Sequence, residues 1–181
     1  MMQEKDNMLV NTCNFMGVSP IMMELPYPPI QVREKNRMYA NILSFDYCGP
    51  VSEMSAITQY ITDESRLSRE KCAIAKTILG IAMAEMIHLQ KLGELIVLLG
   101  GNVDFIARQN NGKRLMWTPE YLKSPESTRS ILQSGIEDEQ AAINQYKMHI
   151  RNIQDEYVGA VLARIIQDEE YHIMLLKALM E

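Results

Sequence analysis

The chain has 181 residues, of which 47% are hydrophobic and 23% charged, a balance typical of one globular domain. Its formal net charge of −5 disfavours nucleic acid or an anionic membrane as the main partner. The first residues are polar and lack the apolar stretch of a signal peptide, and no uncharged apolar run is long enough to span a membrane. We therefore expect a cytoplasmic protein with no nucleic-acid partner and no membrane partner.

The three cysteines, Cys13, Cys48 and Cys72, form no CxxC pair. Zinc ribbons, rubredoxin-type iron centres and disulfide scaffolds are recognised by cysteine spacing, and this spacing matches none of them. The sequence therefore predicts none of these three arrangements. The default compartment is then a reducing cytosol.

The chain opens with an expected extended arm, residues 1–32, which contains four prolines and no sustained helical period. Its apolar stretch between residues 20 and 30 predicts docking on an apolar surface, either of the chain's own bundle or of a second copy. A helical pattern follows over residues 33–66, with an interruption at Gly49-Pro50.

A long second helix is expected from Ser68, as its N-cap, to a stop at Gly100-Gly101. Residues 101–124 show no period and are expected to be irregular. Ser124-Pro125 resembles an N-cap followed by proline at the first helical position, which predicts a third helix to about residue 152. A fourth helix follows a short break near Gln154-Asp155 and runs to the end of the chain.

The connections between these helices predict their topology. Short turns join the first helix to the second and the third to the fourth, so each pair should form an antiparallel hairpin. The connection between the second and third helices is much longer than bundle loops normally are, and such a loop can cross the whole bundle. The sequence predicts an all-α four-helix bundle over residues 33–181 with one long crossover, the arrangement of ferritin-like proteins, preceded by the arm.

Two of the predicted helices share an unusual core pattern. Each has aliphatic residues at spacings of three and four, interrupted at the same place by a glutamate and a histidine three residues apart. Residues three apart lie on one helix face, and burying both groups is unfavourable unless something compensates them. These seams are Ile74, Ile78, Ile81, Glu85, His88, Leu92, Leu95, Leu99 and Val158, Leu162, Ile165, Glu169, His172, Leu176, Leu179.

The other two helices contain a repeat that supplies matching carboxylates. Residues 49–60 align without gaps on residues 135–146, with six identical positions out of twelve. Glu53 and Glu139 are among the identities. The chain therefore reads as an internal duplication, residues 35–100 and 125–181, in which each copy contributes a glutamate and a Glu-x-x-His pair.

Charge decides what this cluster binds. Four ionised carboxylates in one core repel each other, whereas two divalent cations would neutralise them and two imidazoles would complete the ligand set. We predict a site for two manganese or two iron ions with two bridging carboxylates. Carboxylate and imidazole ligands suit both metals, so the ligand types do not distinguish manganese from iron. A metal-free polar network is the alternative. The predicted ligands are Glu53, Glu85, His88, Glu139, Glu169 and His172.

Three further residues are predicted to support these ligands. Tyr60 and Tyr146 each lie two helical turns after a ligand glutamate and can donate to the carboxylates, although ordinary core tyrosines would show the same spacing. Asp168 can bond a ligand histidine from outside, or lie exposed on its helix. His149 aligns with Asp63 of the first repeat, so it has no histidine counterpart there, and we assign it a structural role.

The segment Tyr47-Cys-Gly-Pro-Val-Ser-Glu53 resembles the Y-G-G-P-x-G-E signature of manganese catalases and their short spore-coat relatives, with departures at Cys48 and Ser52. The segments 85–101 and 168–172 resemble bacterioferritin, in which a haem-ligating methionine stands at the position of Met86. The fifth helix of cage-forming relatives has no counterpart, and haem is not expected. Rubrerythrin resembles the bundle but is disfavoured by Ile136 and by the lack of CxxC.

These resemblances to the ferritin-like superfamily imply a function. The first expectation is a dinuclear manganese or iron oxidoreductase that acts on hydrogen peroxide, as manganese catalases do. The alternatives are a di-iron ferroxidase or peroxidase, with dioxygen or peroxide as substrate, and a non-catalytic metal-binding coat protein. A homo-oligomer with contacts through residues 20–30 is expected, in the cytoplasm or associated with a spore.

Overall fold

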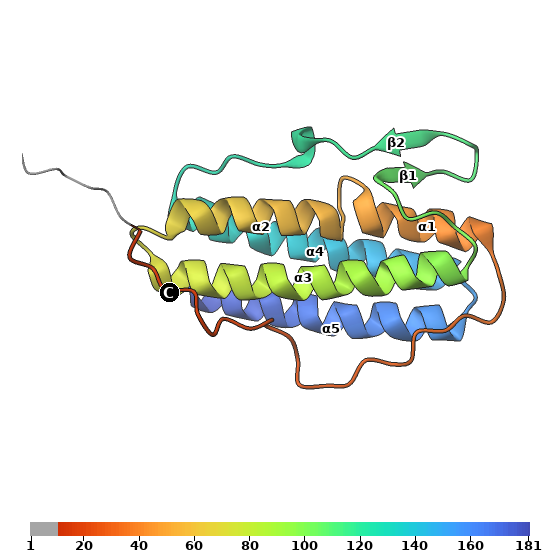
Figure 1. Cartoon of the computed structure of the whole chain (residues 1–181), viewed down its shortest axis with the longest axis horizontal. Coiled ribbons are helices and arrows are strands. Elements are labelled where there is room, and N and C mark those ends of the chain that lie inside the picture. Colours follow the sequence, from red (N-terminus) through yellow and green to blue (C-terminus); the bar gives the residue numbers. More distant parts are fainter. Residues whose placement is uncertain (1–10) are drawn as a thin grey trace, which may run out of the picture.

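The computed structural model describes residues 11–181, so the expectations about the polar start and the first part of the arm lie outside the described residues. In this part of the chain, five α-helices form the body of the molecule (Figure 1). The expected all-α ferritin-like bundle is confirmed. The helices are α1 Arg37–Cys48, α2 Glu53–Leu67, α3 Cys72–Leu98, α4 Thr128–Asn152 and α5 Glu156–Ala178.

The first rod of the bundle is broken into two helices that follow each other along one line (Figure 1). Gly49 ends α1, and a Cβ atom at this position would lie 2.6 Å from the Phe45 carbonyl oxygen, so only glycine fits there. Pro50 has no N–H to continue a helical ladder. Ser52 then caps α2, because its side chain accepts from the backbone N–H of Ser55. Local chemistry thus explains the interruption that the sequence indicated.

Short connections join the helices into the two expected hairpins. Residues 68–71 link α2 to α3, and residues 153–155 link α4 to α5, where Asp155 caps α5 through its side chain. The second helix does not begin at Ser68 as expected. Ser68 ends α2 instead, its N–H donating to the Glu64 carbonyl, and α3 begins at Cys72 without a side-chain cap.

The long crossover runs along the outside of α1 and α2 (Figure 1). The expectation that this segment is irregular is wrong in part. It contains the antiparallel strands β1 Ile106–Arg108 and β2 Arg114–Met116 and a 3₁₀ turn, Pro119–Tyr121. Gly112 turns the chain between the strands with a φ of +88°, a conformation that glycine adopts without strain. Strands of three residues are too short to show a period.

The helix α4 begins three residues later than the Ser124-Pro125 pattern predicts. Ser127 is the N-cap, and its side chain exchanges hydrogen bonds with Ser130 in a reciprocal capping box. A capping box stabilises the first turn because it satisfies two backbone N–H groups that have no helical partner. This reciprocal pair, and not the proline, decides where the helix starts.

Two aliphatic clusters fill the bundle, one on each side of a polar middle layer. One contains the later part of α3 and the earlier part of α5, and the other contains the earlier part of α3 and the later part of α5. Each fully buried leucine or isoleucine contributes roughly 1.5–3 kcal/mol relative to an exposed one. The clusters can therefore offset a strongly polar layer between them.

The helix α3 is long and apolar enough to cross a membrane if length and composition are the only criteria, with a mean hydropathy of 1.5 over 18 residues. Core helices of bundles meet the same criteria. Within this bundle, 44% of that window is buried, and Glu85 and His88 of the same helix are fully enclosed. The helix therefore packs as one of the core helices of the bundle.

The arm lies against its own bundle, along α3 and α5 (Figure 1). The backbone N–H of Ile21 donates to the carbonyl of Gly80 in α3, at 2.9 Å. Arg164 of α5 donates to the carbonyls of Met23 and Leu25. The arm was expected to dock either on its own bundle or on a second copy, and its described part lies on its own bundle.

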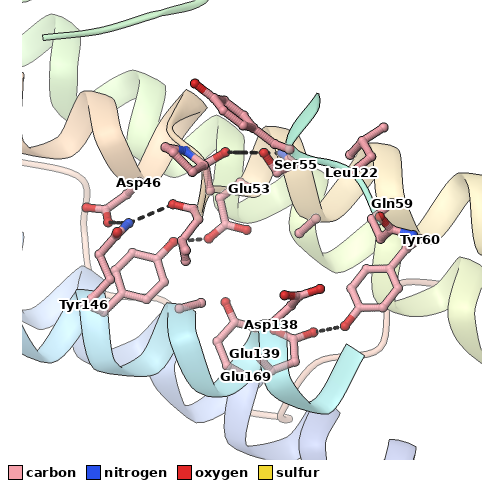
Figure 2. A pocket seen from close by; sticks show the side chains of 17 residues that line it. Asp46, Glu53, Ser55, Gln59, Tyr60, Leu122, Asp138, Glu139, Tyr146 and Glu169 are labelled. Carbon is pink, nitrogen blue, oxygen red and sulfur yellow. Dashed lines mark hydrogen bonds between the residues drawn. The ribbon is translucent and has the colours of Figure 1, made fainter. Parts of the chain in front are cut away.

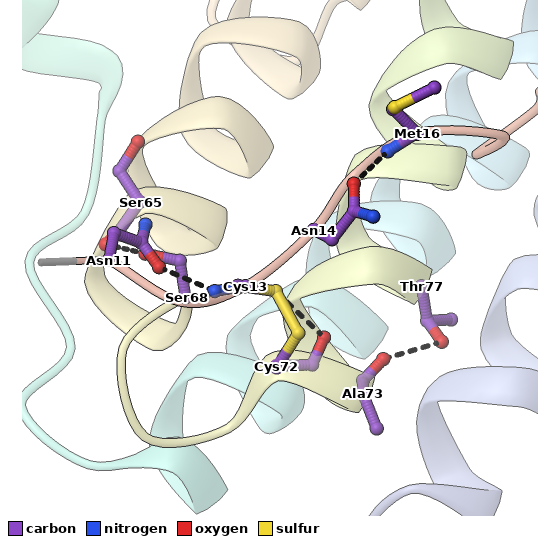
Figure 3. The surroundings of a disulfide bond; sticks show 9 residues. All are labelled: Asn11, Cys13, Asn14, Met16, Ser65, Ser68, Cys72, Ala73 and Thr77. Atoms are coloured by element: carbon purple, nitrogen blue, oxygen red, sulfur yellow. Dashed lines mark hydrogen bonds between the residues drawn. A yellow bond between two sulfur atoms is a disulfide. The ribbon is translucent and has the colours of Figure 1, made fainter.

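A disulfide joins the arm to the start of α3, between Cys13 and Cys72 (Figure 3). The exclusion of disulfide bonding from cysteine spacing is therefore wrong. The two cysteines are 59 residues apart in the sequence, and they meet only because the arm returns to the first turn of α3. Sequence spacing carries no information about such a contact.

Candidate metal centre

All six predicted ligand side chains converge in the middle layer of the bundle, where each is at most 3% exposed. They form two groups of four, and within each group the ligand atoms lie within 4.8 Å of one another. Glu85 and Glu169 belong to both groups. Both carboxylates would therefore be shared if each group held an ion. The groups are Glu53, Glu85, His88, Glu169 and Glu85, Glu139, Glu169, His172.

The imidazole of His88 points one nitrogen into the first group. Its Nδ1 lies 2.8 Å from Glu85 Oε2, 3.3 Å from Glu169 Oε1 and 3.8 Å from Glu53 Oε2. The Glu-x-x-His spacing on α3 places the first of these contacts within one turn. A single nitrogen thus meets the carboxylates of three helices.

The imidazole of His172 does the same in the second group. Its Nδ1 lies 3.1 Å from Glu85 Oε1, 3.0 Å from Glu169 Oε2 and 3.6 Å from Glu139 Oε1. The Nδ1 atoms of the two histidines therefore have matching sets of carboxylate contacts, one set in each group. Each group combines three carboxylates with one imidazole.

The outer nitrogens of both rings have partners away from the centre. His88 Nε2 lies 3.2 Å from Asp168 Oδ2, and His172 Nε2 lies 2.8 Å from the backbone carbonyl oxygen of Ile21. A metal-ligating histidine commonly donates its second N–H to a carboxylate or a carbonyl, which fixes the ring and its tautomer. Both rings are oriented so that Nδ1 is the nitrogen available to a cation.

The two tyrosines cross between the repeats. Tyr60 of α2 donates to Glu139 of α4, and Tyr146 of α4 donates to Glu53 of α2 (Figure 2). All four side chains are buried. The structure thus places each hydroxyl on the glutamate of the other repeat, which fixes the orientation of that carboxylate.

Asp168 is the centre of a further network. Its Oδ1 lies 2.7 Å from Arg164 Nη1 in an ion pair and accepts from the Met23 N–H at 2.7 Å, and its Oδ2 accepts from the Tyr27 hydroxyl at 2.8 Å. Burial alone would raise the pKa of Asp168, but the bonds from His88 and Arg164 outweigh it and lower this pKa to about 2. Asp168 therefore stays ionised beside His88.

Sequence reasoning missed Tyr27, Arg164 and the Ile21 carbonyl. The arm supplies two of these groups, and an extended segment has no period that would indicate which side chains face inward. Arg164 lies one turn before Asp168 on α5, and this spacing was a usable signal for an ion pair.

Burial and mutual repulsion shift the pKa values of the clustered carboxyl groups. Burial, followed by repulsion from Glu85 and Glu169, raises the pKa of Glu139 to about 8 and that of Glu53 well above its usual value. Burial acts in the same direction on Glu85, but His88 and His172 outweigh it, and the pKa of Glu85 is lowered. So close a set of carboxylates is unfavourable without positive charge.

Several polar atoms of this layer have no hydrogen-bond partner among the described residues. They include His172 Nδ1 and the two carboxylate oxygens nearest to it, Glu85 Oε1 at 3.1 Å and Glu169 Oε2 at 3.0 Å. Buried polar atoms without partners are rare in proteins, and each requires an explanation. Two divalent cations between these atoms would supply the missing partners and the missing charge. The residues present fit such a pair of ions.

A cavity of about 60 Å³ leads to the centre from the side of α2 and α4 (Figure 2). Its inner wall includes Glu53, Glu139 and Glu169, and its outer wall includes residues of the α1–α2 break and of the crossover. Neither histidine lines it. The carboxylate side of the centre is thus open to small molecules, whereas the arm covers the histidine side.

Two other predicted features lie apart from the centre. His149 pairs with Asp46 at 2.7 Å in a buried contact, which agrees with a structural role. Met86 is 54% exposed and lies on the opposite face of α3 from Glu85 and His88, which are enclosed.

The Rubrerythrin family matches residues 50–180, a span that contains all six candidate ligands. The chain belongs to the rubrerythrin family. The expectation that Ile136 and the lack of a CxxC pair disfavour rubrerythrin is therefore wrong. No curated protein sequence matches the chain.

Solved structures of ferritin-like proteins share the fold. KatB, a manganese catalase from Anabaena, has a TM-score of 0.76 at 24% identity, covering 86% of this chain and 77% of its own. A bacterioferritin from Rhodobacter capsulatus has a TM-score of 0.66 at 22% identity, with coverages of 81% and 86%. Bacterioferritin BfrA from Mycobacterium tuberculosis has a TM-score of 0.63 at 22% identity and the same coverages. At these identities the comparison establishes the fold alone.

Proposed function

We propose that this member of the rubrerythrin family is a dinuclear manganese or iron oxidoreductase that acts on hydrogen peroxide. The observation that carries the proposal is the pair of carboxylate–histidine groups that share Glu85 and Glu169. The similarity in fold to a manganese catalase supports it. Two metal ions would supply the redox chemistry, in which peroxide is alternately oxidised and reduced to give dioxygen and water.

The residues of the chain have separate tasks in this proposal. The six predicted ligands would hold the ions, and Glu85 and Glu169 belong to both groups of potential ligands. Tyr60 and Tyr146 keep Glu139 and Glu53 in position, and the outer bonds of the two histidines keep Nδ1 directed inward. The aliphatic clusters on either side exclude bulk water, which strengthens every electrostatic contact in the layer.

The proposal is tested by two measurements on one preparation. Protein purified from its native host is analysed for manganese and iron, and the same sample is supplied with hydrogen peroxide while dioxygen is recorded. We expect about two metal ions per chain, as in other dinuclear carboxylate bundles, together with dioxygen release. Full occupancy without any consumption of peroxide would contradict the proposed function.

The second candidate is a ferroxidase that uses dioxygen, and the similarity in fold to bacterioferritins favours it. Adding ferrous iron to the metal-free protein in air and following its oxidation distinguishes this activity from peroxide disproportionation. A non-catalytic coat protein, the third candidate, would bind metal and show neither reaction.

We also propose that the chain forms homo-oligomers. Support comes from exposed apolar side chains on the outer face of α3, among them Met86, Val97 and Leu98. Because the described part of the arm lies on its own bundle, the arm and this face are separate candidates for the contact. Light scattering of the full chain and of a chain lacking residues 1–30 compares them.

The proposed compartment is the cytoplasm or a spore. The Cys13–Cys72 disulfide bears on this choice, because disulfides persist in oxidising compartments and are rare in the cytosol. Alkylating free thiols at the moment of lysis and measuring the mass of the chain reveals which state is present in cells.

A further inference from the structure

The centre has two differently covered sides. On the histidine side the arm lies directly over the ligands, with Ile21 on His172 and with Tyr27 on Asp168, which in turn contacts His88. On the other side the cavity between α2 and α4 reaches three of the four ligand carboxylates (Figure 2). A molecule that approaches from solvent therefore meets Glu53, Glu139 and Glu169 first.

The size of this cavity limits what can enter. A cavity must offer roughly 10–15 Å³ to hold one water molecule, and one of about 150 Å³ holds a benzene ring. The value of about 60 Å³ found here corresponds to a few water-sized molecules. Hydrogen peroxide, dioxygen and a three-atom anion such as azide fit this space, whereas a hydroperoxide that carries an aromatic ring does not.

Two alanines keep the cavity open. Ala56 and Ala142 line it, and each lies three residues, or about one helical turn, after a ligand glutamate on the same helix. They are equivalent positions of the repeat, so they border the cavity from α2 and from α4. A larger side chain at either position would project into the space in front of the carboxylates.

The outer wall is held by a specific contact. Leu122 of the crossover lines the cavity, and the next residue, Lys123, is bound through its backbone to the side chain of Gln59. Gln59 Oε1 accepts from the Lys123 N–H at 2.7 Å, and Gln59 Nε2 donates to the Lys123 carbonyl at 3.2 Å. Gln59 is buried, so this pair of bonds fixes the crossover over the cavity.

We propose that Ala56, Ala142 and Leu122 determine substrate size at this centre, with Gln59 as the positioning residue for Leu122. The cavity admits hydrogen peroxide and other molecules of two or three heavy atoms, and it excludes hydroperoxides that carry an aromatic ring. This inference rests on the proposed function for its substrate, but the cavity itself can be tested separately with azide, which needs no turnover.

The experiment uses the full chain loaded with metal and three substitutions. Ala142→Leu fills the cavity, and Leu122→Ala widens its outer wall. Ala160→Leu is the matched control, because it makes the same change at an exposed position of α5. For each protein, the metal content, the azide affinity by calorimetry, and kcat/KM for hydrogen peroxide and for cumene hydroperoxide are measured. Cumene hydroperoxide can only be reduced, so hydrogen peroxide is supplied as its reductant, and the pair gives the alcohol, water and dioxygen.

We expect Ala142→Leu to keep its metal but to lose about tenfold or more in azide affinity and in kcat/KM for hydrogen peroxide, the size of effect that pocket contacts have on specificity. Leu122→Ala should raise kcat/KM for cumene hydroperoxide relative to hydrogen peroxide by about tenfold. Ala160→Leu should match the unaltered protein in all four measurements.

The outcomes separate the inference from the proposed function. Unchanged azide affinity and unchanged peroxide turnover in metal-loaded Ala142→Leu would overturn the inference, as would equal turnover of both hydroperoxides by the unaltered protein. If the unaltered protein binds azide but consumes no peroxide, the proposed function fails. The loss of azide affinity in Ala142→Leu would then still support the size-limited cavity.

Discussion

The two repeats carry equivalent ligands but differ in the helix that bears the first glutamate of each. In the first repeat α1 ends at Cys48 and α2 starts at Glu53, whereas in the second repeat α4 continues unbroken through the equivalent residues. The alignment places Pro50 opposite Ile136. A proline removes a backbone donor and clashes with the preceding turn, so one position separates a broken rod from a continuous one.

The break has a consequence at the centre. Pro50, Val51 and Ser52 line the outer part of the cavity, whereas the corresponding residues of α4 continue a helix. Gln145 bonds the carbonyl of Val51 at 2.8 Å and thereby holds the break in place. The comparison indicates that the ligands require symmetry between the repeats, whereas access to the ligands depends on the asymmetry.

The largest expected effect tests the symmetry of the ligands. Glu85→Ala and Glu169→Ala should each remove both ions, because each carboxylate belongs to both groups. A bundle of this type is expected to hold about two ions per chain. Glu53→Ala and Glu139→Ala should each remove only one of them, because each of these carboxylates belongs to one group. Elemental analysis after dialysis measures these contents, with the exposed Glu137→Ala as control. Retention of both ions by the combined Glu85 and Glu169 variant would show that the ligand assignment is wrong.

A second substitution tests the asymmetry of the rods. Ile136→Pro introduces the break of the first repeat into α4 and should lower the free energy of unfolding by about 3 kcal/mol or more. Pro50→Ala should change it by less than about 1 kcal/mol, because Gly49 and the Ser52 cap still favour the interruption. Urea unfolding of the metal-free proteins gives both values. Ile136→Ala serves as control, since it loses side-chain packing without breaking the helix.

A smaller effect is expected at the crossed tyrosines. Tyr60→Phe and Tyr146→Phe each leave a ligand glutamate without its hydroxyl donor. Losing an outer partner of a ligand lowers metal affinity by about 10–100-fold, and the two variants should be equal if the repeats are equivalent at the centre. Competition with a chelator measures the affinities. Tyr157→Phe, at an exposed tyrosine of α5, should have no effect, and a large difference between the first two variants would contradict the symmetry.

The mildest effect concerns pH. The folded metal-free protein raises the pKa of Glu139 from 4.5 to about 8 and raises those of His88 and His172 as well. The folded state therefore binds more protons than the unfolded chain in this range, and its stability falls as pH rises from about 5 to about 8. Thermal unfolding should show a gap between metal-loaded and metal-free protein that widens over this range. A metal-free protein that melts higher at pH 8 than at pH 5 would contradict this expectation.

The bundle and the position of its ligands could be predicted from the sequence because both depend on periodicity. A glutamate and a histidine at one site of two aliphatic seams must face the core, and the structure brings all six named residues together. Their binding of metal stays a prediction. The start of α4 could not be placed correctly, because Ser127 and Ser130 stabilise it through a mutual bond that competes with the more familiar Ser-Pro pattern.

The arm and the crossover could not be predicted in the same way. Extended segments obtain their hydrogen bonds from distant residues, as Met23 and Tyr27 do from Asp168. The strands β1 and β2 have three residues each, too few to distinguish alternation from chance. The Cys13–Cys72 pair depends on the course of the arm, which in turn depends on those distant contacts.

The disulfide also distinguishes the repeats in the unfolded chain. It encloses α1, the break and α2 in a closed loop, because the two cysteines are 59 residues apart. In the chain-entropy account, a loop of this length restricts the unfolded ensemble by about 4 kcal/mol. The helices α4 and α5 lie outside the loop. Oxidation therefore restricts the unfolded chain over the repeat whose first rod is interrupted, and reduction would release that segment while leaving the unfolded second repeat unchanged. Because both repeats share the core clusters, the stability gained or lost is that of the whole bundle.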